Sequence, residues 1–330
     1  MGGLADLRSA AERSAREGAV RATVFGLDVQ TRAPVQLLRG ARAAATGRAL
    51  ELIVDEHETR VKHWPDSAEL VCDQREVDGS VSFRIEHDAR AGYLIEGPAY
   101  GASVLELDGR RVRCMPEGRA DQSWQRLLIA QVLPFAAILQ GLEALHASAV
   151  VTKSGAIALS GPSRAGKTTL ALELCRRGAR FLADDVLALE CSGGQLLGHP
   201  GSPVAGLAHA EAQRLESART PLAAEPLAVN AREQLVAMRA ARGPAPLAAL
   251  FFLERRGDAA AAPRFEVVTE PRTLLAATFN TVLTEPARLR ALLELCAVIS
   301  TRRVERVVIG PRTGVEQLAA AIEHRIGRPA

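Results

Sequence analysis

The sequence predicts an α/β fold with a mixed sheet, preceded by a smaller β-rich α+β domain. After residue 145, apolar strand-like runs alternate with helical runs, which is the pattern of an α/β domain. Before about residue 120, short strand-like runs are separated by turn residues. The chain has 330 residues, 48% of them hydrophobic, which is enough for about two domains with a sizeable core. We expect a β-rich domain over 1–122, a helical connector over 123–144 and an α/β domain over 145–330.

Short alternating segments define the first domain. The sequence predicts strands over 21–29, 50–56, 80–87 and 92–97. Asp108-Gly109 lies between two further strand-like runs, and this dipeptide is a strong signal for a hairpin turn. The first domain is therefore expected to be rich in β-strands.

The connector contains the most apolar stretch of the chain, from Leu127 to Leu139. This stretch is too short to span a membrane, and Gln131 and Pro134 interrupt it. We expect a buried helix that Pro134 kinks or divides. Residues 1–18 lack the apolar core of a signal peptide, so we expect a cytoplasmic protein.

Charge and cysteine content argue against several classes of partner and site. The 41 basic and 38 acidic residues give a net charge of +3, so the sequence predicts neither a nucleic-acid nor a membrane partner. The five cysteines are widely spaced and form no C-x-x-C pair. This spacing predicts neither a disulfide framework nor a zinc site.

The second domain begins with two apolar strands, 145–151 and 156–160, joined by a tight turn at 152–155. A helical run over 168–177 follows and stops at Gly178, a residue typical of helix ends. Later patterns predict strands at 251–255, 265–269 and 304–310, and helices near 271–283, 286–300 and 314–324.

The turn between the second strand and the helix has the sequence GPSRAGKT, residues 161–168, which matches G-x-x-x-x-G-K-[ST]. Backbone N–H groups of such a loop, together with the helix N-terminus, form a cradle for phosphate groups. Lys167, one of only three lysines in the chain, can reach the β- and γ-phosphates of a nucleotide, and the Thr168 hydroxyl can ligate Mg²⁺. The predicted nucleotide-binding residues are Gly161, Pro162, Ser163, Arg164, Ala165, Gly166, Lys167, Thr168 and Thr169.

Strand pairing brings a histidine to this loop. With a hairpin turn at 152–155, His146 lies opposite Gly161 or Pro162, at the mouth of the loop. A histidine that hydrogen-bonds a carboxylate there can orient it and tune its basicity.

Two carboxylates are expected at the same edge. The strand 181–183 follows the helix in a right-handed crossover, so its C-terminal end lies beside the phosphate loop. Asp184 and Asp185 stand at that end. One carboxylate can hold Mg²⁺ there, and the other can accept a proton from an attacking hydroxyl.

A second hairpin, with its turn at 191–194, is expected to pair Asp185 near His199 or Pro200. This register would bring the loop 198–203 beside the two carboxylates. His199 is therefore a candidate for positioning the substrate.

The order of these features resembles the catalytic domain of HPr kinase/phosphorylase and of the HPr kinase-like proteins. From 145 to about 190, the segment LHASAVV…ALSGPSRAGKTTLALELCRRGARFLADDVLAL joins a histidine strand, a phosphate loop, a helix ending in Arg-Gly and an Asp-Asp strand end. The resemblance implies a fold similar to phosphoenolpyruvate carboxykinase. It also implies ATP- and Mg²⁺-dependent phosphorylation of a serine on a protein or peptide.

The resemblance also implies roles for individual residues. Asp184 would be the general base, oriented by His146, and Asp185 would assist Thr168 at the metal. Lys167 would act on the phosphates of the nucleotide. All four catalytic positions match the family pattern in this sequence.

Three departures separate the chain from HPr kinase itself. The second signature of that enzyme, a glycine-rich segment with a glutamate and an arginine, has no counterpart after Asp185. The first 120 residues do not resemble its amino-terminal domain, and Arg164 stands where the family usually has glycine. We therefore expect an acceptor other than HPr and no phosphorolysis. The arrangement is more similar to HPr kinase-like proteins encoded with peptide-modification pathways, and this resemblance implies, for example, the precursor of a ribosomally made peptide natural product as the acceptor. HPr kinases are hexameric, so the resemblance is compatible with a homo-oligomer.

Two alternatives use the same loop differently. The loop could hold ATP or GTP as a switch in a binding or regulatory module, whose β-rich domain recognises a peptide or a partner protein. It could also serve a plain ATPase, in which Asp184 activates water. Transfer of phosphate to an acceptor distinguishes a kinase from both.

Overall fold

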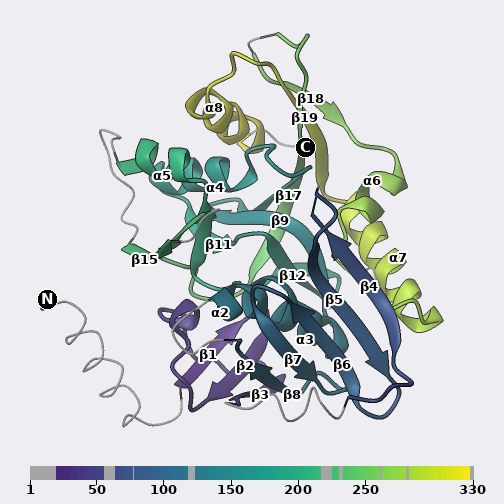
Figure 1. Cartoon of the computed structure of the whole chain (residues 1–330). Helices are drawn as coiled ribbons and strands as arrows, with labels where there is room; N and C mark the ends of the chain where they lie inside the picture. The colour runs from purple at the N-terminus through teal and green to yellow at the C-terminus, as the bar shows by residue number, and fades with distance from the viewer. Residues whose placement is uncertain are drawn as a thin grey trace, which may run out of the picture. The chain divides into compact units, whose positions relative to one another are not determined.

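The computed structural model describes residues 20–55, 64–76, 78–117, 123–216, 225–229, 233–260, 262–279 and 282–327. Its contacts divide the chain into two compact units, Met1–Gly141 and Leu142–Ala330. The helical segment that we predicted as a connector therefore belongs to the first unit. Figure 1 shows strands in both units and labels α4 to α8 in the second.

The first unit is built on a β-sheet. Within its described residues, eight strands form one sheet in the order β1-β2-β3-β8-β7-β6-β5-β4. β3 is parallel to both β2 and β8, and the other neighbours are antiparallel. The elements are β1 (Val20–Val24), β2 (Leu27–Thr31), the 3₁₀ turn η1 (Gln36–Leu38), β3 (Ala49–Val54), β4 (Glu69–Arg75), β5 (Val81–Asp88), β6 (Gly92–Gly97), β7 (Gly101–Leu105) and β8 (Arg111–Met115).

Hairpin turns set the register of this sheet. The hairpin across Asp108-Gly109 is confirmed, because β7 and β8 pair antiparallel on either side of it. The segment 21–29, predicted as one strand, is instead a hairpin that turns at Phe25-Gly26. Both turn residues have positive φ, +53° and +76°, which suits a two-residue turn between twisted strands. Phenylalanine is rare in that conformation, so the alternating pattern concealed the turn.

The helical segment ends earlier than predicted. It consists of α2 (Ser123–Leu127), the π-helical turn η3 (Leu128–Val132) and α3 (Leu133–Leu139). Pro134 lies in the first turn of α3, directly after the π-helical turn, so the segment is divided there as expected. Gly141, with φ of +91°, lies between α3 and β9. Among the helices of the described residues, none is long and apolar enough to cross a membrane.

The second unit contains a mixed sheet. Among its described strands, pairing runs β10-β9-β12-β13-β17-β19-β18, β11 also pairs with β9, and β10 also pairs with β17. The pairs β10–β17 and β17–β19 are parallel, whereas β9 is antiparallel to β10. The elements are β9 (Glu143–Thr152), β10 (Gly155–Ser160), α4 (Lys167–Arg176), β11 (Arg180–Ala183), β12 (Val186–Ser192), β13 (Gln195–Gly198), β17 (Ala245–Arg255), β18 (Arg264–Val267), α6 (Pro271–Ala276), α7 (Pro286–Ser300), β19 (Arg303–Ile309) and α8 (Val315–Ile326).

A smaller sheet lies in a region for which the sequence patterns predicted no elements. Its described strands run in the order β14-β16-β15, where β14 is Val204–Leu207, β15 is Glu225–Val229 and β16 is Gln234–Ala237. The helix α5 (His209–Glu216) follows β14. Leu207 of β14 packs in one cluster with Leu172 of α4. This sheet therefore supports the helix that follows the phosphate loop.

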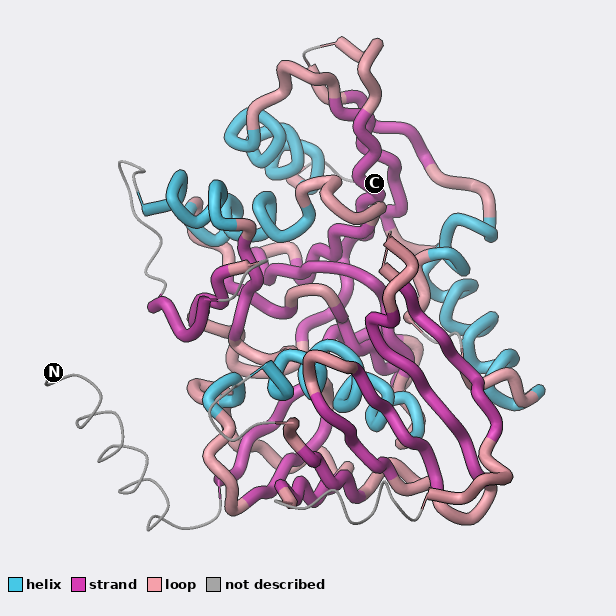
Figure 2. The backbone as a smooth tube through the Cα atoms, viewed as in Figure 1, coloured by secondary structure: helices cyan, strands magenta, loops and turns pink. Residues whose placement is uncertain are grey.

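Helices pack against the main sheet of the second unit in two separate cores. Leu170 of α4 and Leu318 of α8 share one core with Phe251 of β17. Leu295 of α7 shares another core with Leu250, the neighbouring residue of β17. Successive residues of β17 point to opposite faces, so this strand is buried on both sides. The helices are drawn as cyan coils around the magenta strands in Figure 2, and the architecture is the mixed α/β type that the sequence predicts.

Truncation of a central residue of β17 tests this arrangement. Phe251 is 0% exposed and meets Phe265 edge to face. We expect Phe251→Ala to lower the free energy of unfolding by about 3–5 kcal/mol, because it leaves a cavity in a packed core. Leu289→Ala on α7, where the side chain is 44% exposed, is the control and should change it by less than about 0.5 kcal/mol. Equal effects in denaturant titrations would contradict the assigned core.

Candidate functional site

The β9–β10 hairpin brings His146 to the phosphate loop. The last pair of this hairpin is Ser160 with Ala147, so the next pair in register is Gly161 with His146. The Ser160 hydroxyl donates to the backbone oxygen of His146 at 2.9 Å and holds the strand ends together. The predicted register of this hairpin is confirmed.

The loop 161–166 is shaped by residues with positive φ. Gly161 has φ of +140°, and a Cβ atom on it would lie 2.6 Å from the backbone oxygen of Leu253 on β17. Gly166, with φ of +99°, is the N-cap residue of α4. Arg164 has φ of +63°, a left-handed conformation that favours glycine. The loop therefore adopts a strained turn that leads into the N-terminus of α4, where unpaired N–H groups can receive phosphate.

Lys167 lies folded against this loop. Its Nζ donates to the backbone oxygens of Gly161 at 2.8 Å and Pro162 at 3.1 Å. Burial lowers the pKa of Lys167, and the nearby charges of Asp185 and Asp184 oppose that shift. The ammonium group is thus held at the mouth of the loop, where the outer phosphates of a nucleotide would bind.

The Asp184 carboxylate joins three segments. Its Oδ1 accepts hydrogen bonds from the hydroxyls of Ser148 on β9, at 2.6 Å, and Thr168 on α4, at 2.8 Å. Its Oδ2 accepts the backbone N–H of Gly206 at 3.1 Å. Burial, reinforced by the charge of Asp185, raises the pKa of Asp184 to about 6, and the three hydrogen bonds limit the rise.

Asp185 occupies a tight turn in the backbone. β11 and β12 run along β9 one after the other, and the two aspartates interrupt them. The N–H of Val186 donates to the oxygen of Asp184 at 2.7 Å, and Asp185 between them has φ of +61°. These features define a γ-turn, a rare and strained conformation. The turn places the two neighbouring aspartates in different surroundings. Of the two, only Asp185 lines the cavity described below.

His146 contacts the backbone of Asp185. Its ring Nδ1 lies 3.4 Å from the Asp185 carbonyl oxygen, and its ring meets Phe279 edge to face at 5.4 Å. Removal from water lowers the pKa of His146, while its interactions with Asp185 oppose the shift. The sequence predicts His146 against Asp184, whereas the ring contact in the structure is with Asp185.

A cavity of about 830 Å³ gathers the predicted groups. His146, Lys167 and Asp185 line it together with the first residues of the phosphate loop. A histidine, the phosphate cradle and a carboxylate therefore meet at one edge of the sheet. The complete lining is His146, Ser160, Gly161, Pro162, Ser163, Lys167, Asp185, Phe252, Arg272, Thr273, Ala276 and Ala277.

The oxygen atoms around Asp184 suit Mg²⁺. Within the described parts of the chain, no group of three or more His, Cys, Asp or Glu side chains could hold a metal ion. The Asp184 carboxylate and the Thr168 hydroxyl, 2.8 Å apart, are hard oxygen ligands beside the phosphate loop. Mg²⁺ commonly takes one or two such protein ligands and completes its shell with substrate phosphates and water. The donor set therefore fits a metal that arrives with a nucleotide.

The predicted register of the second hairpin is wrong. Its turn consists of two residues, Gly193 and Gly194, both with positive φ, instead of the four residues 191–194. This shorter turn shifts the pairing, so the N–H of His199 donates to Ala188 at 2.9 Å. The His199 ring lies 2.8 Å from the Glu190 carboxylate and does not line the cavity.

The loop after this hairpin still passes close to the site. The N–H of Gly201 donates to the backbone oxygen of Leu182 at 2.8 Å, two residues before Asp184. Beyond the loop, Gly206 supplies the N–H that Asp184 accepts. The expectation that the loop 198–203 returns towards the carboxylates is therefore met by backbone contacts, without the His199 side chain.

Sequence reasoning missed three polar residues at the site. Ser148 carries the shortest of the hydrogen bonds to Asp184 and is 0% exposed. Arg255, the last residue of β17, donates from Nε to the backbone oxygen of Ala165 at 3.1 Å. Arg272 of α6 lines the cavity. Only Ser148 could have been predicted from the sequence, because it lies two residues after His146 on the same strand and so points to the same face. Arg255 and Arg272 come from elements that are distant in sequence.

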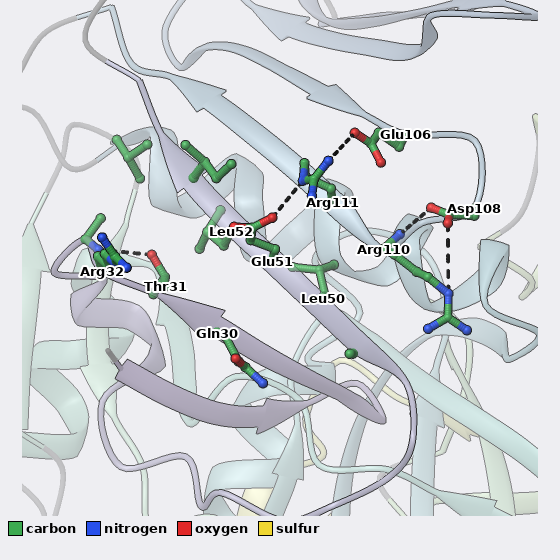
Figure 3. Close-up of a pocket in the computed structure, with 14 residues that line it drawn as sticks. Gln30, Thr31, Arg32, Leu50, Glu51, Leu52, Glu106, Asp108, Arg110 and Arg111 are labelled. Atoms are coloured by element: carbon green, nitrogen blue, oxygen red, sulfur yellow. Dashed lines mark hydrogen bonds and ion pairs between the residues drawn. The ribbon is translucent and has the colours of Figure 1, made fainter. Parts of the chain in front are cut away.

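A cavity of about 1010 Å³ in the first unit is separate from these groups and lies over β2, β3 and β8. Figure 3 shows that Arg110 and Arg111 pair with acidic side chains of the same lining. Arg111 bonds Glu51 at 2.7 Å and Glu106 at 3.2 Å, and Arg110 lies 3.9 Å from Asp108. Internal pairing leaves these groups little charge to offer a ligand.

Comparisons with known proteins find distant similarity among solved structures. No family model and no curated protein matches the sequence. Among solved structures, the chain is similar to the HPr(Ser) kinase/phosphatase from Coxiella burnetii, with 15% sequence identity and a TM-score of 0.30. The match covers 56% of this chain and 91% of that chain.

The conformation of Arg164 generates a test of the loop. The left-handed conformation costs an L-residue about 1–2 kcal/mol, while glycine loses about 0.5–1 kcal/mol more backbone entropy on folding. We expect Arg164→Gly to leave the free energy of unfolding unchanged or to raise it by up to about 1 kcal/mol. Ser163→Gly is the matched control, since Ser163 has no positive φ, and should lower it by about 0.5–1 kcal/mol. Equal losses in urea titrations would refute the strain at Arg164.

Proposed function

We propose that this chain is a nucleotide- and Mg²⁺-dependent phosphotransferase that phosphorylates a serine or threonine hydroxyl of a protein or peptide. The observation that carries the proposal is the division between two neighbouring carboxylates. Asp184 accepts a hydrogen bond from the Thr168 hydroxyl at 2.8 Å, whereas Asp185 lines the cavity with Lys167 and His146. In phosphoryl transfer to a hydroxyl, one carboxylate commonly holds the metal and another accepts the proton of the hydroxyl. Asp184 and Asp185 are placed to take these two roles.

The phosphate loop would bind the nucleotide. Backbone N–H groups of the loop and of the first turn of α4 receive the phosphates, and ATP and GTP present the same phosphate chain to them. Lys167 would exchange its bonds to Gly161 and Pro162, at 2.8 and 3.1 Å, for the outer phosphate oxygens. Its positive charge then stabilises the negative charge that develops on the transferred group.

Thr168 and Asp184 would hold the metal. Mg²⁺ bound there would neutralise charge on the β- and γ-phosphates. Ser148, which donates to Asp184 at 2.6 Å, keeps the carboxylate turned towards Thr168. The chain itself thus fixes the orientation of the ligands before the nucleotide arrives.

Asp185 would be the general base. Its side chain lines the cavity, and His146 contacts its backbone, which limits the movement of the turn. Asp185 takes the proton of the acceptor hydroxyl while the hydroxyl oxygen bonds to the γ-phosphorus. The bond from that phosphorus to the bridging oxygen breaks, and the nucleoside diphosphate leaves. This division reverses the roles that the sequence resemblance implies, in which Asp184 is the base and Asp185 assists at the metal.

Single substitutions test the division of roles. With γ-labelled ATP and a library of serine and threonine peptides, we expect Asp185→Asn to lower kcat by about 10²–10⁴-fold with nucleotide affinity retained. Asp184→Asn should instead raise the Mg²⁺ concentration needed for half-maximal transfer by about 10–100-fold. Lys167→Ala should abolish transfer and weaken nucleotide binding, because it removes the cation from the phosphates. Asp258→Asn, at an exposed carboxylate after β17 that does not line the cavity, should leave both readouts unchanged.

Other outcomes select other functions. Transfer retained by Asp185→Asn and lost in Asp184→Asn, with an unchanged Mg²⁺ requirement, would restore the roles implied by the resemblance. Phosphate release with no labelled acceptor would identify an ATPase. Nucleotide-dependent binding of a partner without any turnover would identify a switch module.

The raised pKa of Asp184 predicts a pH dependence of metal binding. The carboxylate is ionised at pH 7.5, but protonation below pH about 6 removes the negative charge that holds Mg²⁺. We expect Mg²⁺-dependent nucleotide affinity to be about tenfold weaker at pH 5 than at pH 7.5, since each unit below the pKa costs about 1.4 kcal/mol. Calorimetric titrations at the two values measure the ratio.

The variant Asp184→Asn separates this effect from protonation of the nucleotide itself. Its Mg²⁺-dependent affinity should be weak and should keep only the pH dependence of the phosphates. A wild-type ratio equal to that of the variant would mean that Asp184 does not titrate in this range.

A further inference from the structure

The cavity beside the phosphate loop has two different walls. One wall is the loop itself, with Gly161, Pro162 and Lys167. Another part of the lining comes from α6, with Arg272 and Thr273. Since a nucleotide occupies the loop, the α6 wall is the part of the cavity that remains for the second substrate.

The residues that follow α6 contact His146, which in turn contacts the proposed base Asp185. The N–H of His146 donates to the backbone oxygen of Ala277, directly after α6, at 2.7 Å. The Phe279 ring also meets the His146 ring at 5.4 Å. The residues that follow α6 are therefore fixed against the histidine that contacts Asp185. A hydroxyl within reach of Asp185 would have its neighbouring groups beside α6.

Arg272 is the charged residue of the α6 wall. It is exposed, and its guanidinium has no hydrogen-bond or ion-pair partner among the residues that the structure describes. Lys167, the other cation of the cavity, is anchored to two loop carbonyls, and Arg255 is bonded to Ala165 on the loop side. Arg272 is thus available to the acceptor, whereas the other two cations serve the loop.

We propose that the acceptor is an acidic peptide segment, in which a carboxylate lies next to the phosphorylated hydroxyl and pairs with Arg272. A guanidinium group binds a carboxylate through two parallel hydrogen bonds, which fix orientation as well as position. Thr273 adds a hydroxyl beside it, and Phe252 and Ala276 provide apolar contacts for the peptide. This inference rests on the proposed phosphotransferase function and names the substrate class of the same site.

Charge reversal at Arg272 tests the proposal. The full chain, with Mg²⁺ and γ-labelled ATP, is assayed on peptides with a central serine flanked by Asp and Glu, by Ala, or by Lys and Arg. We expect the wild type to prefer the acidic set by about tenfold or more in kcat/KM, as a charge-assisted hydrogen bond permits. Arg272→Glu should reverse the order, and Arg272→Gln should abolish the preference. KM for ATP should stay unchanged in both.

A binding measurement provides a readout independent of turnover. Fluorescence anisotropy of the labelled acidic peptides on nucleotide-free protein should show weaker binding in Arg272→Glu and unchanged binding in Arg290→Glu. Arg290 is an exposed arginine on α7 that does not line the cavity, so the two variants carry the same change in charge. A free serine and a free dicarboxylic hydroxy acid are included, and transfer to these alone would overturn the peptide assignment.

The outcomes separate this proposal from the function on which it rests. Equal transfer to all three peptide sets, or an equal loss on all of them in Arg272→Glu, would overturn the acidic acceptor and leave the kinase intact. A raised KM for ATP in Arg272→Glu would assign the residue to the nucleotide and also overturn the proposal. Nucleotide binding without transfer to any acceptor would overturn the phosphotransferase itself.

Discussion

The hydrogen bonds of the Asp184 carboxylate are the constraint on which the rest of the site depends. They join Ser148 on β9, Thr168 on α4 and Gly206 on β14, three segments that are distant in the sequence. A carboxylate removed from water needs such partners, since burial without them is strongly unfavourable. Burial, followed by the charge of Asp185, raises the pKa of Asp184 to about 6, and the hydrogen bonds from these neutral partners offset the rise only in part.

Two residues with a strained backbone lie in the segments that form the candidate site. Among the described residues, the non-glycine positions with positive φ are Phe25, Arg164 and Asp185. Arg164 lies in the phosphate loop, and Asp185 is the proposed base. Left-handed residues persist only where the surroundings determine the conformation. Here the N-terminus of α4, the strand β9 and the hydrogen bonds of Asp184 do so. A regular strand would place two adjacent carboxylates on opposite faces of the sheet. With the γ-turn, Asp184 bonds Thr168 at the start of α4 while Asp185 lines the cavity beside the same loop.

The sequence predicted the parts of the site that depend on local patterns. The phosphate loop between strand and helix, and the register that puts His146 opposite Gly161, follow from turn length and alternation. His199 was misplaced because register arithmetic depends on knowing the turn, and Gly193-Gly194 makes a turn two residues shorter than assumed. Arg272 lies far along the chain from the loop, and only tertiary packing of α6 brings it to the cavity. The proposed division of roles between the two aspartates also depends on the γ-turn, which has no sequence signature.

The shape of the cavity bears on the choice between transfer to a hydroxyl and hydrolysis. A kinase must favour a bound hydroxyl over water, and it gains most of this preference by holding the acceptor in line and excluding solvent. The lining of the cavity could supply the means, because Phe252 of β17 and Ala276 of α6 are apolar and Arg272, as proposed, would fix one end of the acceptor. An ATPase needs no such lining, since water requires only a base and a phosphate. Arg272 lines the same cavity as Asp185 and its guanidinium has no partner among the described residues, which favours the proposed anionic acceptor over water.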